Sequence, residues 1–125
     1  MTLTVRNRTT IAINSSFDVI LARMRVRQQA RATGFGVREQ ACIALATSSL
    51  ARALRWGEVN EGRVDVYRSD EEERASVHVI CTGANDATCD FRSRAFTDAK
   101  WMVDKLTVEI LPPDDVKITL VKWAR

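Results

Sequence analysis

Histidine and cysteine, two residue types that often carry catalysis or bind metals, are few in this sequence: one histidine and three cysteines. The single histidine, His78, lies in a segment that alternates like a β-strand, and its neighbours mark it as a residue on one face of that strand, so a nucleophilic triad is not supported. Neither GxxxxGK[ST] nor GxGxxG occurs. A hypothetical set of metal ligands would consist of His78, Cys81, Cys89 and either Asp86 or Asp90. The spacing of these residues along the chain matches no zinc motif. The residues alone therefore predict no metal site and no nucleophilic triad.

Arginine supplies the positive charge of the first half of the chain. The protein has 19 Lys+Arg and 16 Asp+Glu, and residues 1–62 hold nine arginines against four acidic residues. Arg23, Arg27 and Arg31 recur at four-residue intervals, which places them on one face of a helix. We take them and Arg52 as candidates for binding an acidic partner, because guanidinium groups pair bidentately with carboxylates. The alternative, that they only solvate the helices, stays open.

Composition limits the class of protein. A chain of 125 residues with 46% apolar residues predicts one domain, 1–125, with a core of its own. No apolar run is long enough to span a membrane, and the first ten residues lack the apolar stretch of a secretory signal. An odd number of cysteines at irregular spacing fits a reducing cytoplasm. No aromatic residues interleave with the basic ones, so we expect no nucleic-acid partner.

The hydrophobic periodicity predicts eight elements in the order β-α-α-β-β-α-β-β. This order favours an α/β two-layer sandwich, with helices on one face of a mixed, mostly antiparallel sheet. The first strand, 3–13, is expected to be irregular around Asn7, and Ser15 with Asp18 predicts a capping box before the first helix, which should stop at Gly34. The remaining expected elements are a helix at 38–56, strands at 62–68 and 75–81, a helix at 95–106, and strands at 107–111 and 116–123.

Two of the helices have clear apolar faces. In the first, Phe17, Ile20, Leu21 and Met24 follow i, i+3, i+4, i+7 spacing, opposite the arginine face. In the second, the inner face is expected to consist of Ile43, Ala46, Thr47, Leu50, Ala53 and Leu54. The three tryptophans, Trp56, Trp101 and Trp123, are most simply interpreted as core or edge packing.

Four segments, in this order, resemble the Bergerat ATPase fold of GHKL proteins. The resemblance is strongest to the small bacterial serine kinases of partner-switching systems: the anti-sigma-factor kinases and the RsbT-type kinases of the stressosome. RATGFGVREQACI (31–43) resembles their helix–GFG–helix junction, and SSLARAL (48–54) their SELARNI segment. DAKWMVDKLTVE (98–109) resembles the helix after the ATP lid, and VKITLVKWAR (116–125) the terminal strand. The resemblance implies the GHKL fold for this chain.

The nucleotide-binding residues of that family do not carry over. Active relatives have a catalytic glutamate and, four residues later, a Mg²⁺-binding asparagine; the matching positions here are Ser49 and Ala53, while Arg52 between them persists. The adenine motif D-x-G-x-G corresponds to Cys81–Asn85, where Gly83 alone matches. The stretch matching the glycine-rich lid, 91–98, contains no glycine, and PPDDVK (112–117) replaces the last glycine-rich element.

The resemblance and these losses together imply a non-catalytic regulatory module without a cofactor. Its vestigial ATP site would comprise Ser49, Ala53, Cys81, Gly83 and Asn85. Its partner would be a STAS-domain protein or scaffold, a PP2C-type phosphatase or a sigma factor, and no membrane would be involved. Two alternatives remain. One is an active serine/threonine kinase that uses ATP and Mg²⁺, with Arg92 and Arg94 contacting phosphate; the other is an adaptor or homodimeric structural domain.

Overall fold

A five-stranded antiparallel sheet and three helices make up the computed structural model, which describes residues 4–71, 74–85 and 91–124. The elements follow the chain as β1 (Thr4–Ile13), α1 (Ser16–Ala32), α2 (Val37–Ala53), β2 (Gly62–Glu71), β3 (Arg74–Ala84), α3 (Arg94–Trp101), β4 (Lys105–Leu111) and β5 (Asp115–Trp123). The strand order across the sheet is β1-β2-β3-β5-β4.

All four strand pairs are antiparallel, so the expectation of a mixed sheet is wrong. The reason lies in the connections. The α1–α2 hairpin returns the chain to the end of the sheet where β1 finishes, so that Ile13 pairs with Gly62 at the start of β2. In the same way α3 and β4 bring the chain back to the end of β3, where Ala84 pairs with Asp115.

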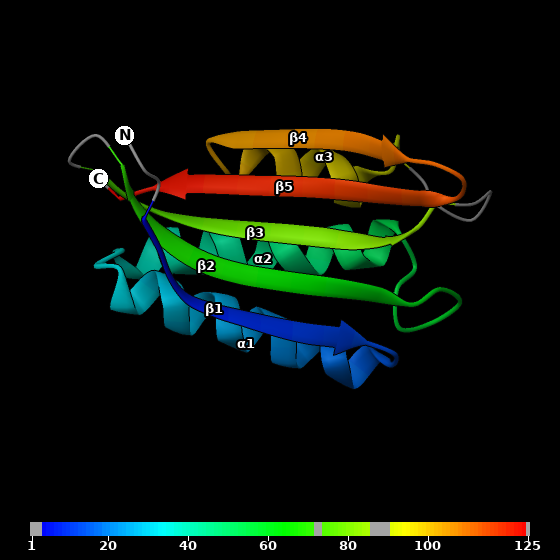
Figure 1. The fold of residues 1–125 in the computed structure, drawn as a ribbon, viewed down its shortest axis with the longest axis horizontal. Coiled ribbons are helices and arrows are strands. Elements are labelled where there is room, and N and C mark those ends of the chain that lie inside the picture. The colour runs from blue at the N-terminus through cyan, green and yellow to red at the C-terminus, as the bar shows by residue number, and fades with distance from the viewer. Residues whose placement is uncertain (1–3, 72–73, 86–90, 125) are drawn as a thin grey trace.

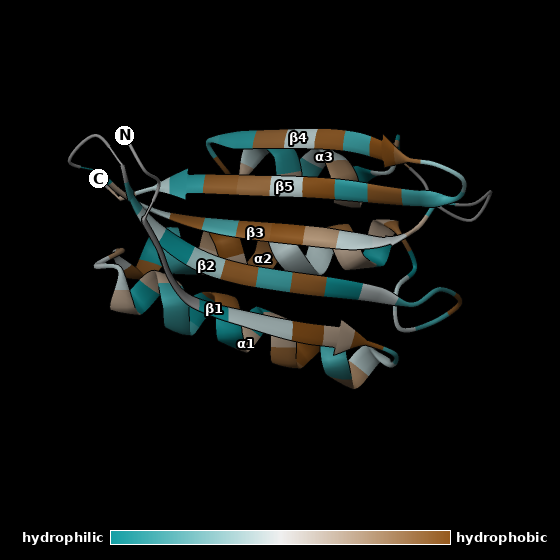
Figure 2. Cartoon of the chain, in the orientation of Figure 1, coloured by the Kyte–Doolittle hydropathy of each residue, from teal (hydrophilic) through white to brown (hydrophobic). Residues whose placement is uncertain are grey.

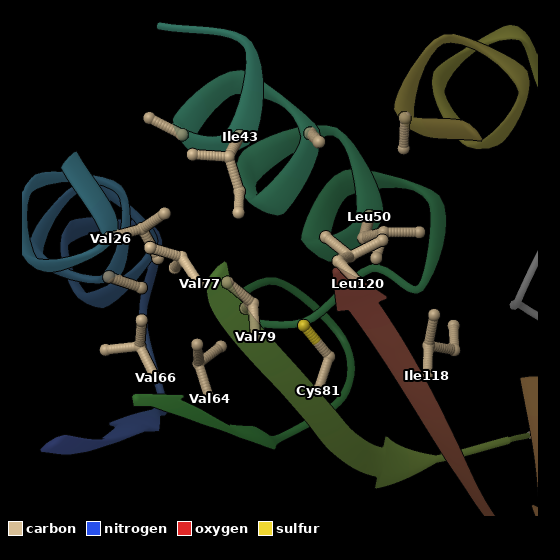
Figure 3. Packing of buried hydrophobic residues seen from close by; sticks show 14 of the residues in the cluster. Val26, Ile43, Leu50, Val64, Val66, Val77, Val79, Cys81, Ile118 and Leu120 are labelled. Carbon is tan, nitrogen blue, oxygen red and sulfur yellow. The ribbon is translucent and has the colours of Figure 1, made fainter. Parts of the chain in front are cut away.

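The three helices lie on one face of the sheet (Figure 1). Figure 2 shows apolar segments on β3, on β5 and on the edge strand β4, as well as on α2 behind the sheet. The core forms where the inward residues of β2, β3 and β5 meet α1 and α2 (Figure 3). The predicted inner face of α2 is confirmed, since its six members are all buried: Ile43, Ala46, Thr47, Leu50, Ala53 and Leu54.

Local signals at the ends of α1 are also confirmed. The Asp18 carboxylate accepts hydrogen bonds from the backbone N–H of Asn14 (2.8 Å) and of Ser15 (3.1 Å), as a capping box requires. Gly34 follows the helix with φ of 92°, a conformation that glycine adopts without a steric penalty. The expected irregularity in β1 is present as a register shift between Arg6 and Thr9.

The predicted apolar face of α1 is not its buried face. The side chains that α1 buries are Ala22, Val26 and Ala30, whereas Phe17 is 63% and Met24 52% exposed. These small residues, spaced by four, let α1 approach α2 and the edge of the sheet closely. The larger apolar side chains are consequently turned toward solvent.

The expected third helix, 95–106, is too long. The helix ends at Trp101 because the following residues join the sheet: Asp104 donates its N–H to the carbonyl of Val121 (3.0 Å) and accepts from the N–H of Trp123 (2.9 Å). Trp101 is therefore left 82% exposed at the helix end, contrary to the expectation of packing. Similarly α2 ends at Ala53 rather than at Trp56.

The observed orientation of α1 makes a prediction about stability. Val26→Ala should lower the free energy of unfolding by about 2 kcal/mol, since it leaves a cavity in the core. Met24→Ala, two residues away, should change it by less than about 0.5 kcal/mol. Urea denaturation of both variants measures the difference. Equal losses of unfolding free energy in the two variants would mean that Val26 is not the inward-facing residue of α1.

Candidate functional site

The indole of Trp56 lies over two glycines of the sheet. Gly62 of β2 and Gly83 of β3 are paired across the strands. A Cβ atom added to Gly62 would lie 2.4 Å from Trp56 Cδ2, and one added to Gly83 would lie 2.6 Å from Cε2 and Cζ2 of the same ring. Trp56 is only 2% exposed. The space above both glycines is therefore filled by the protein's own side chain.

The turn after α2 brings Trp56 to this position. Leu54 follows the last residue of α2 as its C-cap, and Arg55 takes a left-handed conformation with φ of 57°. The backbone N–H of Trp56 donates to the carbonyl of Ala51 (2.9 Å), and its indole Nε1 has no hydrogen-bond partner among the described residues. The ring is thus held by packing on the paired glycines rather than by polar contacts.

Cys81, which stands where the resemblance places the adenine-binding aspartate, is 1% exposed and belongs to the core. Figure 3 shows its sulfur directed toward the helix layer. Burial, with a smaller effect of the Asp65 carboxylate, raises the pKa of the thiol from its ordinary 9.0 to about 12. The thiol stays protonated at neutral pH and is a weak hydrogen-bond acceptor.

The other positions of the vestigial ATP site lie in two places. Ser49 and Ala53 are on α2, where Ala53 is buried and Ser49 half-buried. Gly83 and Asn85 lie at the end of β3, where the N–H of Asn85 donates to the carbonyl of Asp114 (2.7 Å). An open hollow of about 620 Å³ beside Gly83 is lined by β2, β3, the first residue of β5 and the 59–61 turn. Of the five positions, Gly83 alone lines this hollow.

The candidate arginines, in contrast, lie together. Three adjoining hollows of about 500, 280 and 270 Å³ are lined by residues of both α1 and α2. The first two share Met24 and Arg27, and the last two share Arg23, so they form one continuous depression, here called the α1–α2 groove. One wall is the stripe of α1 from Ser16 to Arg31, and the other is the stripe of α2 from Val37 to Arg52.

The four arginines of the groove are exposed and carry no compensating acid. Within the described parts of the chain, none of them forms an ion pair or a side-chain hydrogen bond. The acidic residue that lines the groove, Glu58, lies 3.7 Å from Arg55 instead. These four arginines are Arg23, Arg27, Arg31 and Arg52.

Sequence reasoning did not find the apolar part of this site. Ile20, Met24, Val37 and Leu45 line the groove and are each 46% exposed or more. The expectation that the arginines of the first helix lie opposite Ile20 and Met24 is wrong, because Arg23 and Arg27 line the same hollows as these two residues. The signal was present in the sequence: at 3.6 residues per turn, positions 20, 23, 24 and 27 fall within one stripe of a helix. A solvated face does not need that apolar component.

Metal binding gains no support within the described residues. They contain no group of three or more potential metal ligands. His78 and Cys81 face opposite sides of β3: Cys81 is in the core, while the His78 ring stacks on Tyr67 with ring centroids 4.8 Å apart. The other members of the hypothetical set, Cys89 with Asp86 or Asp90, lie outside the described residues.

Comparison with protein-family models and with curated proteins finds no match to this chain. Within the described residues, no helix has both the length and the apolarity needed to cross a membrane.

The packing of Trp56 can be tested by a double-mutant cycle. Gly62→Ala should cost about 1–3 kcal/mol of stability, because the new methyl group collides with the indole. In a Trp56→Leu background the same change should cost at least about 1 kcal/mol less. Gly36→Ala, whose Cβ would meet only the flexible end of Glu39, serves as the control and should add independently. If the effects of Gly62→Ala and Trp56→Leu were also additive, the indole would not lie on Gly62.

Proposed function

We propose that this chain is a non-catalytic, GHKL-like module of bacterial partner-switching signalling, which acts in the cytoplasm by docking a STAS-domain protein. The observation that carries the proposal is the Trp56 indole, which fills the space above Gly83, the one residue retained from the adenine motif. A purine would have to displace this side chain from the core.

The chemistry of the remaining positions supports the same conclusion. A serine hydroxyl at position 49 is not a base at neutral pH without an activating neighbour, and the methyl group of Ala53 cannot bind Mg²⁺. The exposed Asp114 and Asp115, next to Asn85, would repel phosphate. The positions for base, metal, adenine and phosphate are all unsuited to ATP, so we assign no cofactor.

The α1–α2 groove supports docking as the activity. Its unpaired guanidinium groups can form charge-assisted hydrogen bonds with carboxylates. We propose a STAS-domain protein or stressosome scaffold as the partner; a PP2C-type phosphatase or a sigma factor that presents an acidic surface would fit the same arginines. The module would then resemble a pseudokinase, in which the kinase-like scaffold serves only for recognition.

Titration with Mg-ATP tests the loss of nucleotide binding. A ligand at a hundredfold excess over its dissociation constant stabilises a protein by about 2.7 kcal/mol, which is easily seen as a rise in Tm. We expect no saturable shift in thermal denaturation, and no saturable heat in calorimetry, up to millimolar Mg-ATP. A saturable response would favour the active-kinase alternative, with ATP and Mg²⁺ as cofactors.

Charge reversal tests docking. Arg23→Glu with Arg27→Glu should weaken binding to a STAS-domain protein encoded near this chain's gene, mainly by slowing association, and more at low salt than at high salt. Arg25→Glu with Arg38→Glu is the matched control, because it changes the net charge equally at exposed positions outside the groove. Surface plasmon resonance at two salt concentrations measures both. Equal effects of the two pairs would place the interface elsewhere.

A further inference from the structure

The α1–α2 groove combines positive charge with exposed apolar surface along its whole length. Large apolar side chains in its walls are 46% to 71% exposed: Ile20, Met24, Val37 and Leu45. Contiguous exposed apolar surface on a folded protein commonly marks a site of interaction. Arginines alone would bind a charged loop; the apolar residues between them require a partner with an apolar stripe of its own.

The electrostatics of the groove determine the sign of the partner's charge. Residues 16–53, which contain both helices, include six arginines and two acidic residues. One of these acidic residues, Asp18, is occupied in capping α1. Four of the arginines line the groove without an ionic partner in the described structure. The complementary surface is therefore acidic.

The shape of the groove indicates the partner's secondary structure. Its walls are two neighbouring helices of 17 residues, which are each about 25 Å long at 1.5 Å per residue. On α2 the lining includes small residues, Ala41, Ala44 and Ser48, which allow close approach of another helix. We propose that the groove receives an acidic amphipathic α-helix of the partner protein, with its apolar stripe against Met24 and Leu45 and its carboxylates against the flanking arginines.

This proposal rests on the docking function and specifies the element that docks. Two other occupants fit less well. A second copy of this chain, paired through the same face, would set arginines against arginines. A bilayer would be met best by a convex apolar ridge, whereas this surface is concave between its two helices.

The experiment uses a synthetic probe of 18 residues, with leucines at three- and four-residue intervals and glutamate or alanine elsewhere. A second peptide has lysine in place of each glutamate, and a third has the same composition in an order that scatters the leucines around the helix. Binding is followed by two-dimensional NMR of the isotope-labelled protein, with the indole N–H of Trp56 as a reporter at one end of the groove.

We expect saturable binding of the first peptide, with shifts confined to α1, α2 and Trp56. The lysine and scattered peptides should bind at least about tenfold more weakly, as should the first peptide to Met24→Asp or Arg27→Gln. Ile110→Asp is the control, because Ile110 is as exposed as Met24 but lies on β4. It should bind normally.

Three results would overturn the proposal: no saturable binding of the acidic peptide at 1 mM, equal binding of the scattered peptide, or binding of phosphatidylserine vesicles without binding of the peptide. Failure here is distinct from failure of the proposed function. If STAS binding depends on Arg23 and Arg27 while the peptide does not bind, the docking function stands and the helical partner element is wrong.

Discussion

The contact between the Trp56 indole and the paired glycines of β2 and β3 joins the helix layer to the sheet. Trp56 is the largest fully buried side chain of the described core. Glycine at both positions lets the ring lie directly on the backbone, where any Cβ atom would collide with it. The position of the turn after α2, and with it one end of the α1–α2 groove, follows from this contact, since Trp56 also lines the groove.

The packing of α1 determines which of its side chains are exposed to solvent. Ala22, Val26 and Ala30 are small and almost fully buried, and they bring the helix close to its neighbours. The larger apolar residues and the arginines are thereby displaced onto the outer surface beside α2. The buried stripe of small residues on one side of the helix and the exposed groove on the other are two results of the same rotation.

Much of the fold could be predicted from local signals in the sequence. The capping box, the left-handed glycine after α1 and the inner face of α2 depend on neighbouring residues or on one strong periodicity, and all three are confirmed. The buried face of α1 could not be predicted in the same way. Periodicity ranks residues by hydrophobicity, whereas the close packing of this helix selects for small size.

The candidate site shows the same limit. Arg23, Arg27 and Arg31 could be found because their spacing is regular. The groove that they line together with Arg52 depends on how two helices pack, which neither helix specifies alone. The position of Trp56 was equally hidden: its contact with Gly62 and Gly83 crosses from the end of one helix to two strands, and nothing in the sequence near Trp56 marks it. The prediction that Trp101 is packed was wrong for a different reason. Its helix ends early because Asp104 pairs with β5, which leaves the indole at the helix end.

Because Trp56 fills the space above Gly83, substitutions that would open a ligand site there are costly. Truncation of a buried tryptophan costs about 3–5 kcal/mol, a large part of the 5–15 kcal/mol that typically separates a folded domain from its unfolded chain. A variant that opened this space for a ligand would therefore lose much of its stability unless a second change restored the lost packing. The buried indole makes a return to small-molecule binding at this place costly in stability.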